Sequence, residues 1–127
     1  MTNNKHITDL HKEITEWKSN IEFTRDELKT YQNRLAEVAA KNNETEVMAE
    51  VEKYQNKFIR QFEVADELFH DLKIKDANYA ELVKSNPVAS DRRLTDDHVE
   101  LRDKVETYVK LYSEDKSNFN SFISKWL

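Results

Sequence analysis

Apolar residues recur at alternating spacings of three and four along residues 47–82. This spacing keeps one seam of side chains on one side of an α-helix. A second column, Met48, Phe62 and Phe69, lies one position after the seam and widens it to the face of a helix that contacts two neighbours. The pattern predicts the central helix of a bundle, with the seam Val47, Val51, Tyr54, Phe58, Gln61, Ala65, Leu68, Leu72, Lys75, Tyr79 and Leu82.

Similar seams precede and follow this stretch, and together they predict helices near residues 5–41, 44–84 and 95–126. The first seam is Ile7, Leu10, Ile14, Trp17, Ile21, Thr24, Leu28, Tyr31, Leu35 and Val38. The third is His98, Leu101, Val105, Tyr108, Tyr112, Asp115, Phe119, Phe122 and Trp126. We therefore expect one all-α domain over residues 1–127, an elongated antiparallel up-down-up three-helix bundle with coiled-coil-like heptad seams.

Capping residues place the expected helix ends. Asn43 to Glu46 reads as an N-x-x-E capping box, and Asn42 or Asn43 is best suited to a left-handed conformation between the first two helices. Thr95 reads as the N-cap of the third helix. Residues 73–78 favour helix only weakly, so a continuous second helix and a break there both fit the sequence.

Five polar residues, Thr24, Gln61, Lys75, His98 and Asp115, stand in otherwise apolar seams. Thr24 and Gln61 fall at about the same height in the first hairpin, which predicts a polar layer that fixes helix register, with a ligand contact as the alternative. Asp115 stands among aromatic residues. It is either a buried carboxylate with a raised pKa or one that reaches water or a lysine.

A chain with 35% charged residues, no Gly and one Pro is either a disordered polyelectrolyte or a protein of long helices. A disordered polyelectrolyte is disfavoured because the 127 residues include 13 aromatics and carry a net charge of only -5. Charges of both signs are interspersed, so we expect no nucleic-acid partner. No apolar run is long enough for a membrane span, and we expect a cytoplasmic protein.

One end of the expected bundle gathers possible metal ligands. The starts of the first and third helices meet there and bring His6, His11, His98 and Asp97 to the same end. Imidazole and carboxylate groups together can bind a divalent first-row metal. The alternative is that His6 and His11 are exposed and that His98 is half-buried in the first turn of its helix.

Catalytic motifs are scarce in this sequence. A chain without glycine cannot contain a P-loop, a nucleophile elbow or a dinucleotide-binding fingerprint. Glu67 and His70 match the E-x-x-H of di-iron bundles, but only one such motif occurs and its residues flank a seam position. We therefore expect no enzymatic activity, no cofactor and no small-molecule substrate.

Apolar residues outside the seams indicate association. Three helices can cover one another's seams, but they do not obviously cover Phe23, Ile59 and Leu111 together. A second copy that packs through a two-fold interface would bury such residues. The apolar segment from Phe119 to Leu127 is either core or an exposed anchor. The sequence favours a helical interaction or scaffold protein with a homodimer or another helical protein as partner; the alternative is the divalent-metal-binding bundle.

Overall fold

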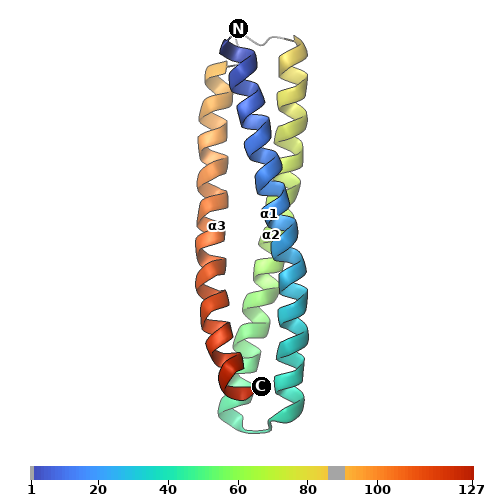
Figure 1. Ribbon diagram of the computed structural model, residues 1–127, viewed down its shortest axis with the longest axis vertical. Helices are drawn as coiled ribbons and strands as arrows, with labels where there is room; N and C mark the ends of the chain where they lie inside the picture. Colours follow the sequence, from blue (N-terminus) through green and yellow to red (C-terminus); the bar gives the residue numbers. More distant parts are fainter. Residues whose placement is uncertain (1, 86–90) are drawn as a thin grey trace.

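The fold is a bundle of three long helices, seen in a computed structural model that describes the backbone of residues 2–85 and 91–127 and the side chains of residues 9–81, 84 and 96–127. The helices are α1 (Thr2–Lys41), α2 (Thr45–Ser85) and α3 (Asp91–Trp126). They run side by side along the long axis, with the α1–α2 turn at one end and the N-terminus at the other (Figure 1). We call these the hairpin end and the open end. None of these helices, within the described residues, has the length and apolar character needed to cross a membrane.

Contacts between α1 and α2 show that the two helices run in opposite directions. His11 contacts Asp76 near the open end, and Arg25 Nε lies 3.1 Å from Asp66 Oδ1 further along. Nearer the hairpin end, the ring centroids of Tyr31 and Phe58 are 5.9 Å apart. The backbones of α1 and α2 approach each other closely, whereas α3 stays further away. The inner side of α3 carries several large buried side chains, among them Tyr108, Tyr112 and Phe119.

The core follows the predicted seams and divides into two clusters. The open-end cluster comprises Leu10, Ile14, Ile21, Ala65, Leu68, Leu72, Tyr79, Leu101, Val105 and Tyr108, with Trp17, Val64 and Phe69 packed against it. The hairpin-end cluster comprises Leu28, Tyr31, Leu35, Val38, Val47, Val51, Tyr54, Phe58, Tyr112, Phe119 and Phe122. Phe119 and Phe122 are therefore core residues, as the first of the two readings of the last segment predicted.

Two capping predictions are wrong. No described residue has a positive φ, so neither Asn42 nor Asn43 adopts the left-handed conformation. Instead, the Asn42 side chain donates to Val38 O at 2.9 Å and to Trp126 O at 3.2 Å, which satisfies carbonyls near the ends of α1 and α3. The first bond of α2 runs from Met48 N to Glu44 O at 3.0 Å, so α2 begins one residue later than the capping box predicts.

The start of α3 also differs from the prediction. Because α3 begins at Asp91, Thr95 lies inside the helix and is not its N-cap. Residues 91–94 contain no glycine or proline that would stop the helix there.

Helix α2 continues through residues 73–78, where the sequence left a break open. Its polar residues there contact the neighbouring helices: Lys75 Nζ lies 3.3 Å from Asp97 Oδ2, and Asp76 contacts His11. These contacts compensate for the weak local preference for helix.

Candidate functional site

His98 joins all three helices at the open end. Its side chain is only 1% exposed, because it lies two turns inside α3 and not in the first turn, half-buried, as the sequence suggested. The ring stacks on Trp17 of α1, with centroids 5.0 Å apart and an interplanar angle of 24°. Its Nδ1 lies 2.9 Å from the Tyr79 hydroxyl of α2, and its Nε2 lies 2.5 Å from Glu13 Oε1 of α1.

The protonation states of Glu13 and Tyr79 decide which atom donates in each hydrogen bond of His98. Burial acts to raise the pKa of Glu13, but hydrogen bonds from Arg102 and His98 outweigh it and lower the pKa. Glu13 is therefore a carboxylate that accepts from Nε2–H of His98 and, at 2.7 Å, from Arg102. Burial, followed by the charges of Asp97, Asp76 and Glu13, raises the pKa of Tyr79 to about 12. The Tyr79 hydroxyl thus stays protonated at neutral pH and can donate to Nδ1.

The structure gives each described residue of the predicted metal group a different partner. His11 contacts Asp76, His98 contacts Glu13 and Tyr79, and Asp97 contacts Lys75; the side chain of His6 lies outside the described residues. Within the described residues, no group of three or more His, Asp or Glu could hold a metal ion. The metal-binding alternative stays a prediction, which metal analysis of protein purified without a His tag would test.

Two further polar seam residues, Gln61 and Asp115, connect α2 with α3. Gln61 donates to Asp115 Oδ2 at 2.9 Å, and Lys57 donates to Asp115 Oδ1 at 3.1 Å. Asp115 therefore reaches a lysine, as one of the two readings predicted. Thr24 donates to Asn20 O in its own helix at 3.0 Å, and the register-fixing polar layer of Thr24 and Gln61 stays a prediction.

Three hollows lined by described residues lie between the helices, and they differ sharply in how many charged residues line them. The α2–α3 hollow of about 280 Å³ is lined by Asp71, Ile74, Lys75, Asp97, Glu100, Leu101 and Lys104, of which five are charged. The α1–α3 hollow of about 480 Å³ is lined by Phe23, Asp26, Glu27, Thr30, Tyr31, Arg34, Asn120 and Ile123, of which three are charged. A third hollow, between α1 and α2, has no charged lining residue and encloses about 430 Å³.

We call this third hollow the hairpin-end groove. Its lining residues are Gln32, Leu35, Ala36 and Ala39 of α1 and Met48, Val51, Gln55 and Ile59 of α2. Met48 is 37% exposed and Ile59 is 49% exposed. In a chain with 35% charged residues, an uncharged and partly apolar surface groove is unusual in composition. Charge depletion of this kind is typical of the buried centre of a protein–protein interface.

The exposed residues singled out from the sequence do not share one face. Phe23, Ile59 and Leu111 are all at least 49% exposed. However, Phe23 lines the α1–α3 hollow, whereas Ile59 lines the hairpin-end groove. Leu111 follows Lys104 by two helical turns and so lies on the side of α3 that borders α2. Of the three, only Ile59 lies in a groove without charge.

Comparison with known proteins finds no match to this chain among protein-family models, curated proteins or solved structures.

Proposed function

We propose that this chain is a non-enzymatic helical interaction protein that acts as a homodimer, and that a second copy binds at the hairpin-end groove. The observation that carries the proposal is the contrast between this groove, with no charged lining residue, and the other two hollows, with five and three. Apolar surface that is free of charge is the kind that association buries most favourably. A cytoplasmic location is part of this proposal, and the position of a fluorescent fusion in cells would check it.

A second copy is the occupant that the groove favours. The described residues form three helices side by side, so each helix has an outer side that neither of the other two covers (Figure 1). Most soluble oligomers are symmetric assemblies of one chain, and two-fold dimers are the commonest of them. A groove that spans two helices offers a second copy more contact than a single exposed residue would.

Light scattering after gel filtration, at micromolar concentration, tests the proposal. We expect a mass near twice the 15.1 kDa of one chain. Ile59→Glu should shift the mass to that of one chain, because it places a charge inside the groove. Phe23→Glu is the matched control: it makes the same kind of change at an exposed apolar residue of another hollow, and it should leave the mass unchanged.

Two results would contradict the proposal. A wild-type mass of one chain that persists on concentrating the protein tenfold would rule out the homodimer. A dimer that Phe23→Glu disrupts, and that Ile59→Glu leaves intact, would place the interface on another face. Circular dichroism of both variants would show that the helices are retained, as expected for changes at exposed positions.

A further inference from the structure

Among the lining residues of the hairpin-end groove, Met48 alone carries sulfur. The chain contains no cysteine and two methionines, Met1 and Met48. The other lining residues have aliphatic or amide side chains. A methionine thioether is oxidised to a sulfoxide, and methionine sulfoxide reductases convert the sulfoxide back. The groove therefore holds one group that oxidation can change and reduction can restore.

The position of Met48 opens it to an oxidant without making it part of the core. Met48 is 37% exposed in the single chain. Neither core cluster of the described residues includes it. Water can therefore hydrate a polar group at this position while the three helices stay packed. Oxidation should leave the fold of the single chain intact, whereas oxidation of a buried methionine disrupts a core.

Association changes the surroundings of the sulfur. In a two-fold interface the same surface of each copy takes part, so the homodimer proposed above removes both copies of Met48 from water. The thioether is apolar, and its burial favours association. A sulfoxide oxygen is a hydrogen-bond acceptor that loses its water on burial. That loss costs free energy unless a donor replaces the water.

The lining of the groove offers few donors to such an oxygen. Of the lining residues, only Gln32 and Gln55 carry side-chain N–H groups. Gln55 follows Met48 by seven residues, or about 10 Å along α2. Gln32 is adjacent to Tyr31, whose ring lies beside that of Phe58. Phe58 is ten residues from Met48, or about 15 Å along α2. Both amides of the same chain thus lie well away from Met48 along the rod.

We infer, resting on the homodimer proposed above, that Met48 is a modification site at which a hydroperoxide controls assembly. The thioether allows the two copies to associate, and the sulfoxide keeps them apart. In the reaction, the O–O bond of hydrogen peroxide breaks, an S–O bond forms at the Met48 sulfur, and water leaves. The sulfur is oxidised by two electrons and the peroxide is reduced.

The oxidant acts on the dissociated chain. Met48 is exposed there, whereas the interface would cover it in the dimer. Each oxidised chain is lost to the association equilibrium, so dimers dissociate by mass action. Reduction of the sulfoxide returns the chain to the pool that can associate.

Peroxide oxidation followed by light scattering tests the inference. Wild-type protein is treated with hydrogen peroxide at a concentration low enough for dimers to dissociate, and peptide mass spectrometry measures the conversion of Met48 to the sulfoxide. After the peroxide is removed, we expect the dissociation constant of the dimer to rise by about tenfold or more, because polar groups are buried without partners. Methionine sulfoxide reductases with dithiothreitol should restore the dimer.

Two variants assign the effect to Met48. Met48→Leu keeps an apolar side chain of similar size, so it should form the dimer. It should not respond to peroxide, although Met1 remains in the chain. Ile59→Glu, which we expect to be a single chain, should be oxidised at Met48 and should keep the mass of one chain. Circular dichroism before and after oxidation should show the same helix content in all three proteins.

Four results would overturn the role of Met48 and leave the homodimer standing. The first is a dimer that stays equally tight with Met48 fully oxidised. The second is a Met48→Leu dimer that peroxide also dissociates. The third is a wild-type Met48 that peroxide leaves intact while it oxidises Met48 of Ile59→Glu. The fourth is a loss of helix on oxidation, because the sulfoxide would then act on the fold.

The failure of the proposed function has a different sign. A wild-type mass of one chain before any oxidation would overturn the homodimer, and the role of Met48 with it. A wild-type dimer that weakens on oxidation and recovers on reduction, beside a Met48→Leu dimer that does neither, supports the inference.

Discussion

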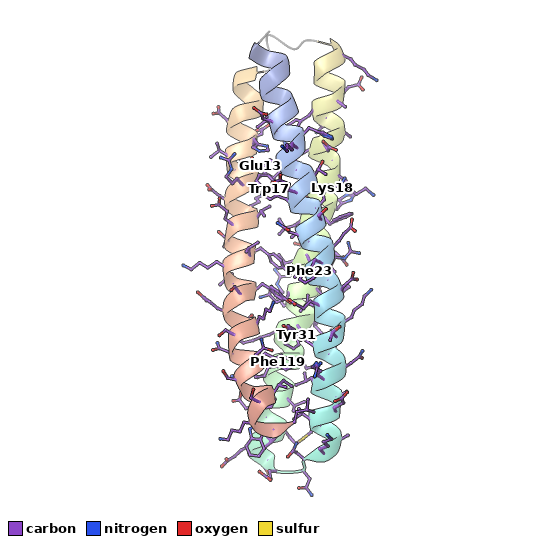
Figure 2. The ribbon with its side chains drawn as sticks, viewed as in Figure 1. Glu13, Trp17, Lys18, Phe23, Tyr31 and Phe119 are labelled. Carbon is purple, nitrogen blue, oxygen red and sulfur yellow. The ribbon has the colours of Figure 1, made fainter. Side chains whose placement is uncertain are left out.

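The two halves of the rod have different interiors. The hairpin half is closed by aromatic rings, and Phe119 lies edge-on to Phe58 at 4.8 Å between centroids with an interplanar angle of 84°. The open half is packed mainly by aliphatic residues around the polar group of His98, Glu13 and Tyr79. Figure 2 shows Tyr31 and Phe119 in the hairpin half and Glu13 and Trp17 in the open half. Both halves also have hydrogen bonds between helices, such as Gln61–Asp115 in the hairpin half, but those of the open half centre on the buried ring of His98.

The outer side of the α1–α2 pair also differs between the halves. Charged groups cover it in the open half, and no charged residue lines the groove in the hairpin half. In the open half, the cationic groups of Lys18, Arg25 and Lys73 lie 5.1–6.0 Å from the ring centroid of Phe69, and Arg25 also pairs with Asp66. In the hairpin half, the groove has no charged residue to cover its apolar side chains. The open half therefore covers the partly buried ring of Phe69 with its own cations, whereas the groove of the hairpin half has no such cover.

The comparison of interiors predicts that truncation costs most in the aromatic half. Phe119 is fully buried, and Phe119→Ala should lower the free energy of unfolding by about 3–5 kcal/mol. Leu68 of the open half is 5% exposed. Leu68→Ala should lower the free energy of unfolding by less than Phe119→Ala does, towards the lower end of the range of about 2–5 kcal/mol for buried leucine. Urea unfolding at one fixed protein concentration would measure both.

The control for these truncations is Leu111→Ala. Leu111 is 51% exposed, so its truncation should change the free energy of unfolding by less than about 0.5 kcal/mol. A larger cost for Leu68→Ala than for Phe119→Ala would show that the aromatic half is not the stronger one.

Alkaline pH should act on the open half through Tyr79. Its folded-state pKa of about 12 exceeds the ordinary value of 10.0, so its contribution to stability is present below pH 10 and is lost as pH rises towards 12. The loss should be about 2–3 kcal/mol for that difference in pKa. Tyr79→Phe should remove this part of the pH dependence in urea unfolding between pH 10 and 12.

Other tyrosines contribute to the same decline in both proteins. Burial raises the pKa of Tyr108, and burial with a hydrogen bond to Glu27 raises the pKa of Tyr112. The comparison of Tyr79→Phe with wild type is therefore the informative one. Parallel curves for the two proteins would mean that Tyr79 does not titrate in this window.

Acidic pH should act on the same half through Glu13. Glu13→Gln removes the carboxylate that accepts from His98 and Arg102, and should cost about 1–2 kcal/mol at pH 7. Because the folded-state pKa of Glu13 lies below its ordinary 4.5, the stabilisation by wild-type Glu13 is present above that value and is lost as pH falls through the lower folded-state value. Glu16→Gln, at an exposed position on the same helix, is the control and should change the free energy of unfolding at pH 7 by less than about 0.5 kcal/mol.

Apart from the controls, the smallest effect is expected on the outer surface of the open half. Arg25→Ala removes the contacts with Asp66 and Phe69, and should cost less than about 1 kcal/mol because both are partly exposed. Urea unfolding would measure it. A cost above about 2 kcal/mol would mean that the cations over Phe69 are part of the packing and not only a cover for it.

The sequence predicted the helices and most of the core because both depend on a local period. Apolar residues at this spacing lie on the inner side of their helix whichever helices are its neighbours. Leu72 is one of them, and it is fully buried as expected. The partner of a polar residue depends on how the helices are rotated and staggered, which no single period contains. Gln61 therefore bonds Asp115 of α3 and not Thr24 of α1.

The candidate surface was only partly predictable for the same reason. Ile59 stood out in the sequence as an apolar residue outside its seam. The absence of charge around it became visible only when the α1 positions, among them Ala36 and Ala39, were placed beside Met48 and Gln55 of α2. A sequence signal did exist, but only along one line of each helix: Gln32, Ala36 and Ala39 of α1 and Met48, Gln55 and Ile59 of α2 are uncharged in a chain that is rich in charge.

The unequal spacing of the helices has a consequence for how the chain folds. Because α1 and α2 are close and are joined by a turn of three residues, their contacts form with little loss of chain entropy. Helix α3 contacts them through aromatic side chains at a larger backbone separation, so it should join a hairpin that already exists. Pulse-labelling hydrogen exchange during refolding should protect the amides of α1 and α2 before those of α3; simultaneous protection would show that the three helices form in one step.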